Sequence, residues 1–167
     1  LKNQGKLEAA LASYRESARL QPDFAQTHSA IGIMLDDKGK RDEAEAAFER
    51  AIENSPGHDQ ANACLGLILT QQEGRLEDAL KCFRKSLSVN PDLYDAHRGF
   101  SAALQLSANL KNYYPAFEAD LKFCFESKSM DARNVALPAA AQLLHKYGVT
   151  DPAHISQERL QELAHQM

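Results

Sequence analysis

The sequence predicts an all-α protein in which pairs of antiparallel helices stack into a solenoid. Prolines recur at nearly constant spacing, at Pro22, Pro56 and Pro91. The segments that end at these prolines align without a gap, which indicates an internal repeat. Apolar residues inside each repeat are spaced three and four apart, as on one face of a helix rather than of a strand. The three aligned segments are Gly5–Pro22, Gly39–Pro56 and Gly74–Pro91.

Each aligned segment predicts the second helix of a repeat unit. An alanine is followed four residues later by an aromatic residue, then by a small residue, and the proline closes the segment. Proline is tolerated at a helix end but not inside a helix, and it pushes the preceding residue out of helical geometry. The repeated alanines are Ala10, Ala44 and Ala79, the aromatics Tyr14, Phe48 and Phe83, and the small residues Ser17, Ala51 and Ser86.

A second pattern follows each proline and predicts the first helix of the next unit. An apolar residue is followed by a small one, and a leucine comes four residues after the apolar one. Because Gly32 and Gly66 carry no side chain, we expect the partner helix to approach closely there. The period is one residue longer at "TQQEGR", a turn where an insertion costs little. The aligned positions are Ile31, Leu65 and Phe100, then Gly32, Gly66 and Ser101, then Leu35, Leu69 and Leu104.

On these motifs, residues 1–105 resemble the tetratricopeptide repeat family, whose 34-residue units each contain two antiparallel helices. The resemblance implies a right-handed α-solenoid. Such a helix pair cannot bury its apolar face alone, and stacking of neighbouring units completes the core. The predicted array covers residues 1–106, with a partial repeat at 1–24, full repeats at 25–58 and 59–93, and the start of a fourth from 94.

The repeat pattern stops after the start of the fourth unit. Tyr113 stands where a small residue is expected, and Pro115 follows it. Because proline is tolerated in the first turn of a helix, we expect Pro115 to open a new helix that runs to about Glu126. Further helices are expected after Asp131 and from about Ser156. Residues 107–167 are therefore predicted to be a degenerate repeat and a helical, non-repeat C-terminal cap or connector.

Composition argues against several classes of partner. The net charge of −4 disfavours a nucleic-acid partner, and no apolar run is long enough to span a membrane. The three cysteines are too few and too scattered for a disulfide framework or a zinc motif, which favours a reducing compartment and a cytoplasmic location. The chain begins at Leu1 rather than at a methionine, so we expect it to be a fragment of a longer protein.

No motif in the sequence predicts catalysis. The glycine-rich phosphate loops and the G-x-S-x-G elbow are absent, and no cysteine has a histidine and an acid at recognisable spacing. His28 and His97 occupy equivalent repeat positions, where packing is a better explanation than metal ligation. We therefore predict that the chain is not an enzyme and that it holds no cofactor and no metal.

The family resemblance implies a concave groove lined by the first helix of each unit. Ile33, Leu67 and Ala102 align along it as an apolar stripe rimmed by polar groups, which is typical of a peptide or helix groove. Cationic residues are missing from the positions with which some members of the family grip a carboxylate, so that mode is not expected. The predicted partner-binding residues are Gln26, Ser29, Ile33, Asp37, Gln60, Ala63, Cys64, Leu67, Arg98 and Ala102.

The function predicted first is protein–protein interaction, with a partner's peptide or helix in the groove. An alternative is that the chain is the docking or regulatory arm of a larger bacterial enzyme, such as a transferase, whose catalytic domain lies elsewhere. A further alternative is that the C-terminal helices themselves cover the apolar stripe. Another alternative is self-association, in which the open repeat edge at Leu1 stacks on another chain.

Overall fold

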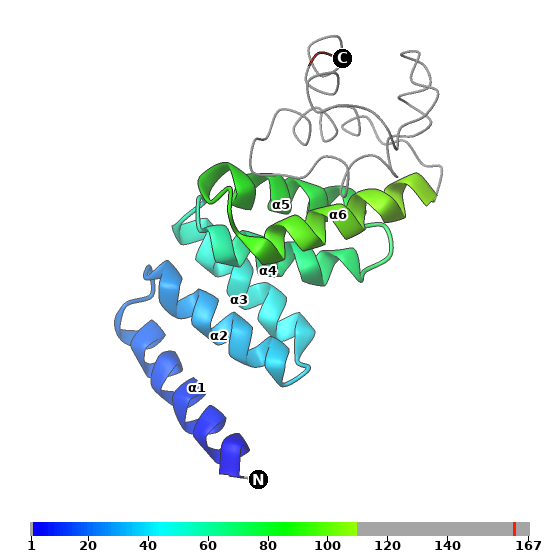
Figure 1. Ribbon diagram of the computed structural model, residues 1–167. Helices are drawn as coiled ribbons and strands as arrows, with labels where there is room; N and C mark the ends of the chain where they lie inside the picture. Colours follow the sequence, from blue (N-terminus) through cyan, green and yellow to red (C-terminus); the bar gives the residue numbers. More distant parts are fainter. Residues whose placement is uncertain (1, 110–161, 163–167) are drawn as a thin grey trace.

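The computed structural model of the chain describes residues 2–109 and 162, with side chains from 5 to 106 and at 162. Over residues 2–109 the chain forms six α-helices and no strand, as the sequence predicts. Figure 1 shows them stacked in order along the molecule, with α1 at one end and α5 and α6 at the other. The helices are α1 (Lys2–Leu20), α2 (Ala25–Asp37), α3 (Arg41–Asn54), α4 (Asp59–Thr70), α5 (Leu76–Val89) and α6 (Tyr94–Asn109).

The helices pair in the order that the repeats predict. Helix α2 packs on α3 and α4 packs on α5, so each forms one unit, while α3 packs on α4 and joins the two units. Helix α1 packs on α2 as the second helix of an earlier unit, and α6 packs on both α4 and α5. The helices expected within 107–167, among them Pro115–Glu126, lie outside the described residues. The proposed boundary at residue 106 stays a prediction.

Glycines shape the turns inside the two complete units. Gly39 and Gly74 have φ angles of +73° and +77°, a left-handed conformation that glycine adopts at little cost. After α2, the Lys40 N–H donates to the Leu35 carbonyl at 2.9 Å, which closes the helix end. Gly5, which aligns with these glycines, lies inside α1 instead, because that helix already begins at Lys2.

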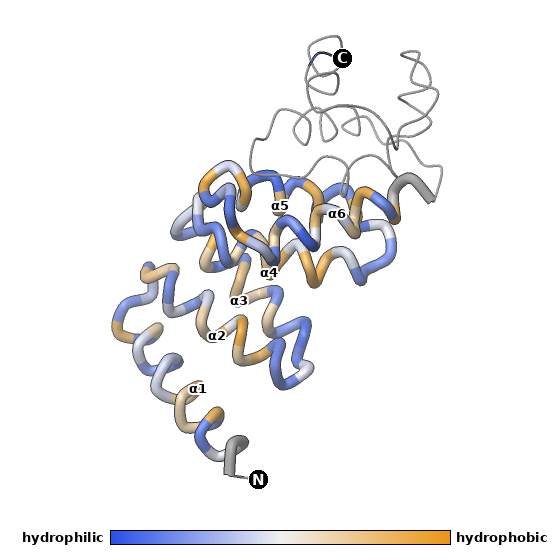
Figure 2. Tube along the Cα trace, viewed as in Figure 1, coloured by the Kyte–Doolittle hydropathy of each residue, from blue (hydrophilic) through white to orange (hydrophobic). Residues whose placement is uncertain are grey.

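The core lies between the helices, and Figure 2 shows hydrophobic and hydrophilic stretches alternating along them. Phe48 and Phe83 are 1% and 0% exposed. A Cβ atom added at Gly32 would lie 2.6 Å from the Phe48 ring, so the absent side chain is what lets that ring fit against α2. Tyr14, the equivalent aromatic residue of α1, is 38% exposed, because the described chain places no first helix of its own unit against it.

A hydrogen bond recurs at each repeat junction. The carbonyl of Pro22 accepts from His28 Nε2 at 2.7 Å, and that of Pro91 accepts from His97 Nε2 at 2.5 Å. In the middle unit Asn62 Nδ2 donates to the Pro56 carbonyl at 3.2 Å. These side chains therefore bind backbone carbonyls in the turns that join the units, which agrees with a packing role for the two histidines.

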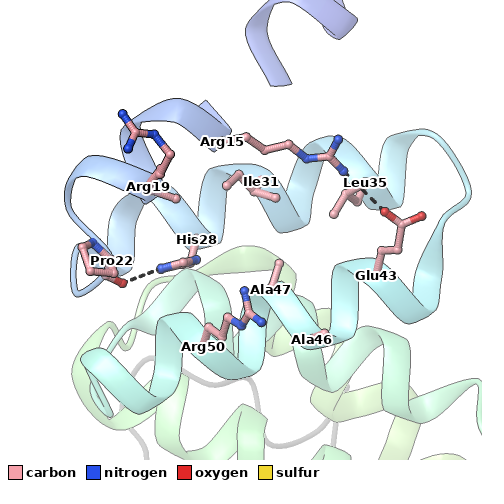
Figure 3. A pocket seen from close by; sticks show the side chains of 11 residues that line it. Arg15, Arg19, Pro22, His28, Ile31, Leu35, Glu43, Ala46, Ala47 and Arg50 are labelled. Carbon is pink, nitrogen blue, oxygen red and sulfur yellow. Dashed lines mark hydrogen bonds and ion pairs between the residues drawn. The ribbon is translucent and has the colours of Figure 1, made fainter. Parts of the chain in front are cut away.

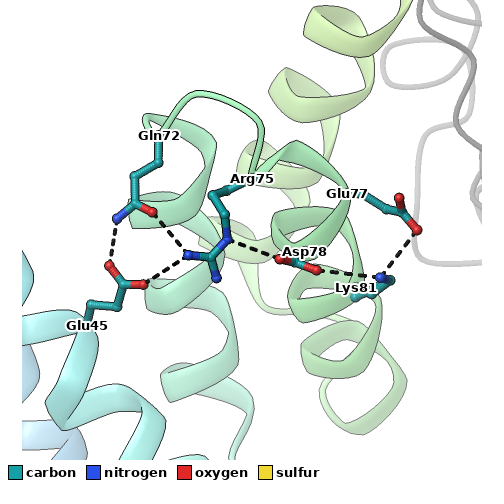
Figure 4. Close-up of polar contacts among 6 residues, drawn as sticks. All are labelled: Glu45, Gln72, Arg75, Glu77, Asp78 and Lys81. Atoms are coloured by element: carbon teal, nitrogen blue, oxygen red, sulfur yellow. Dashed lines mark hydrogen bonds and ion pairs between the residues drawn. The ribbon is translucent and has the colours of Figure 1, made fainter.

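The longer turn between α4 and α5 reaches back to the preceding unit. Gln72 Nε2 donates to Glu45 Oε2 at 2.6 Å, and the Arg75 guanidinium lies 3.6 Å from the other oxygen of the same carboxylate. Arg75 also donates to Asp78 at 3.1 Å. Asp78 in turn forms an ion pair with Lys81, as Figure 4 shows. The extra residue in "TQQEGR" therefore lies in a turn that contacts α3.

Candidate functional site

The predicted groove corresponds to one side of α2, α4 and α6, which we call the inner face. Helix α4 lies between the other two and packs on both. Ile33 on α2 and Leu67 on α4 are half-buried against the core, and Ala102 on α6 is exposed. Since these three residues occupy equivalent repeat positions, they form an apolar line across the inner face.

Close packing of α4 against α6 fixes the position of Leu67. A Cβ atom added at Gly99 would lie 3.0 Å from Leu67 Cδ2, so the glycine leaves room for the leucine side chain. Part of Leu67 stays accessible to solvent.

Polar residues border this apolar line. Gln26, Asp37, Gln60 and Arg98 are all exposed, as the groove prediction requires. Gln26 Oε1 lies 3.0 Å from His58 Nε2, and His58 Nδ1 accepts from the Ala61 N–H at the start of α4. Because Nδ1 accepts, Nε2 carries the proton and donates to Gln26, so this glutamine helps to join α2 to α4.

Two residues predicted for the groove lie beneath the surface. Ser29 and Ala63 are each 1% exposed, because neighbouring helices close over them. They offer a partner almost no contact area, and their small size serves close helix packing instead. The predicted residues that remain accessible on the inner face are Gln26, Ile33, Asp37, Gln60, Cys64, Leu67, Arg98 and Ala102.

Carboxylates make the inner face acidic around Cys64. Burial, followed by the charges of Asp95 and Asp36, raises the pKa of the Cys64 thiol to about 11. Asp36 on α2 and Asp95 on α6 are both exposed, so the inner face carries negative charge on two of its helices. The cation Arg98 lies 3.7 Å from Asp95 and is partly neutralised by it.

Both described thiols are expected to react slowly in the folded chain. Burial also raises the pKa of Cys82 to about 11. In a Cys124→Ser background, alkylation by iodoacetamide at about pH 8 should be roughly 100-fold slower than in urea, because only the thiolate reacts. A thiol held neutral stabilises the fold below its unfolded pKa, so stability should fall as the pH rises from about 9 through 11. Equal rates in buffer and in urea would contradict this.

The described residues contain no recognisable catalytic or metal centre. No three His, Cys, Asp or Glu side chains among them are placed to hold a metal ion together. A high thiol pKa makes Cys64 and Cys82 poor nucleophiles, which is the opposite of what covalent catalysis needs. Among α1 to α6, no helix has both the length and the apolar composition needed to cross a membrane.

Comparison with known families decides what kind of repeat this is. A family model described as "Tetratricopeptide repeat" matches residues 1–59 and again 30–92, which together cover more than half of the chain. The chain belongs to the tetratricopeptide repeat family. Repeats of this family form a non-catalytic helical scaffold for protein–protein interaction, so its partners are proteins.

A solved structure supports the same fold. A mutant of the O-GlcNAc transferase of Thermobaculum terrenum superimposes with a TM-score of 0.58 at 22% sequence identity. The match covers 83% of this chain but only 23% of the transferase chain, so this sequence spans less than a quarter of that protein. No curated protein matches the sequence.

Proposed function

We propose that the inner face binds an extended or helical segment of a partner protein and that the chain acts as an adaptor. The observation that carries this proposal is the line of Ile33, Leu67 and Ala102, aligned by the repeat and accessible on successive first helices. An apolar strip bordered by polar side chains suits a peptide whose apolar side chains recur at regular spacing, as they do in an extended strand or a helix.

The charge of the inner face favours a basic partner segment. Asp36, Asp37 and Asp95 are exposed carboxylates, and Asp95 already faces Arg98. A lysine or arginine beside an apolar anchor would pair with these carboxylates, whereas an acidic segment would be repelled. We therefore propose a segment in which leucine-like anchors are flanked by basic residues.

We expect a double substitution on the apolar line to abolish this binding. Ile33→Gln with Leu67→Gln keeps similar side-chain volume but removes the apolar contact, and should weaken binding at least about tenfold. An array of short peptides, each with leucines flanked by lysines, would be screened first, and the strongest would then be titrated by fluorescence anisotropy.

The matched control is Val89→Gln, which changes an exposed apolar residue at the end of α5, a helix that is not one of the three inner helices. It should bind as the unsubstituted chain does, and all variants should keep the same helical circular dichroism. Retained affinity in the inner-face double variant would contradict the proposal, as would a preference for glutamate-flanked peptides.

A second candidate function is the docking arm of a larger transferase. The similarity to the transferase of Thermobaculum terrenum over 83% of this chain favours it, although at 22% identity the likeness concerns the fold. The full reading frame tests it directly. A glycosyltransferase domain in the same frame would support this function, and a frame that encodes only helical repeats would contradict it.

Self-association through α1 is a further proposal. Tyr14 and Leu20 are 38% and 65% exposed there. Sedimentation velocity over a range of concentrations tests this, since a monomer throughout would exclude it.

A further inference from the structure

A pocket lies on the opposite side of α2 from the inner face, between α1, α2 and α3, and we call it the outer pocket. Its volume is about 480 Å³, within the usual range of ligand sites. Helix α2 contributes Ile31 and Leu35 to it, which at 100° per residue point away from Ile33. Figure 3 shows the side chains that line the pocket. A partner on the inner face would therefore leave the outer pocket free.

The outer pocket exists because its floor is made of small residues. Ala18 on α1 and Ala47 on α3 line it. In the next groove along the stack, between α3, α4 and α5, the equivalent repeat positions hold Ile52 and Cys82. Both of those larger side chains are half-buried against the core. The same architecture thus carries larger side chains at one junction than at the other.

The two grooves also differ in charge. The outer pocket is lined by Arg15, Arg19 and Arg50 with Glu43 as its one carboxylate, in a chain whose net charge is −4. The residues equivalent to Arg15 and Arg19 in the next groove are Glu49 and Glu53. The pocket is therefore a local basic site, whereas its counterpart carries acidic residues at those positions.

Two of the arginines are available to an anionic ligand. Arg50 makes no hydrogen bond or ion pair with any described residue, and Figure 3 shows it beside Ala47. Arg15 lies 3.5 Å from Glu43, and the side chains of both are about half exposed, so this pair contributes little. Glu43 also accepts from Lys40 at 2.6 Å and would stay paired if Arg15 turned toward a ligand. Arg19 is held by Glu16 at the rim.

We propose that the outer pocket binds an acidic segment of a partner protein. A leucine-sized side chain occupies the alanine floor, and a neighbouring carboxylate binds Arg50 and Arg15. Arginine suits this task because its planar fork donates two parallel hydrogen bonds to one carboxylate. With a basic segment on the inner face and an acidic one here, the chain holds two partners, or two parts of one, on opposite sides of α2.

The test uses an array of short peptides that carry one leucine and one aspartate at varied separation in a glycine–serine background. Matched peptides have lysine in place of aspartate. The strongest aspartate peptide, labelled with fluorescein, is then titrated by fluorescence anisotropy. Arg50→Glu should weaken binding about tenfold or more. Ala18→Ile with Ala47→Cys copies the larger residues of the next groove and should weaken binding comparably.

Matched controls separate this site from the rest of the surface. Lys85 is the residue equivalent to Arg50 in the next groove, so Lys85→Glu should leave the affinity unchanged. The inner-face variant Ile33→Gln with Leu67→Gln should also bind normally, so this proposal and the adaptor proposal can fail separately. Thermal melts show whether each variant is folded. The proposal is overturned if aspartate and lysine peptides bind alike, or if a folded Arg50→Glu variant binds as the unsubstituted chain does.

Discussion

Replacing Phe83 with alanine is expected to lower the free energy of unfolding by about 3–5 kcal/mol, the cost of a large aromatic truncation in a core. The Phe83 side chain is 0% exposed. Its ring fits against Gly66 on α4 and Gly99 on α6, and its centroid lies 6.4 Å from that of Phe100. Truncation would therefore leave a cavity where three helices meet. Urea unfolding followed by circular dichroism measures the loss.

Tyr14→Ala is the matched control, because Tyr14 occupies the same repeat position in α1. It is 38% exposed, so its truncation removes fewer contacts and should cost about 1 kcal/mol or less. Phe48, which is 1% exposed, should behave like Phe83. If Tyr14→Ala were as costly as Phe83→Ala, burial in the repeat core could not be the cause of either effect.

The helix order could be predicted from the sequence because its signals act locally. A proline restricts its own residue and the one before it, whatever the rest of the chain does. Three such restrictions at equivalent places predicted the ends of α1, α3 and α5. The conformation of Gly5 could not be predicted in this way. It aligns with Gly39, but Gly39 lies in the turn between α2 and α3, whereas at Gly5 the chain is already inside α1.

The inner face was predicted only in part, for a geometric reason. Helical periodicity shows which residues share a side of α2 or α4, and Ile33 and Leu67 on that side are half-buried. It does not show how closely the next helix approaches. Ser29 and Ala63 share that side but lie where neighbouring helices meet, so they are buried.

The outer pocket was missed because it depends on a difference between repeats. Alignment emphasised what the units share, whereas the pocket arises where Ala18 and Ala47 replace the larger Ile52 and Cys82. The signal for the pocket lies in the aligned positions that differ between units rather than in those that match. In a stack of similar grooves, the groove that departs from the others in size and charge is the better candidate for a specific ligand.

Replacing Gly66 with alanine is expected to destabilise the chain by about 1–3 kcal/mol, as overpacking of a core does. The new Cβ atom would lie 2.7 Å from Phe83 Cε1, and the buried ring has no free space into which to move. Alanine alone favours a helix over glycine by about 0.5–1 kcal/mol, so the clash must exceed that gain. Thermal melts and urea unfolding measure the balance.

Two further variants separate the clash from helix propensity. Gly5→Ala adds the same atom to α1 where nothing lies within 4 Å, so it should stabilise the chain slightly. Gly66→Ala combined with Phe83→Leu should cost less than the sum of the two changes, because the smaller side chain makes room for the new methyl group. Strict additivity, or a stabilising Gly66→Ala, would mean that the Phe83 ring does not depend on Gly66 for its place. The coupling energy therefore measures how far the small residue of one helix and the aromatic residue of the next act as a single packing unit.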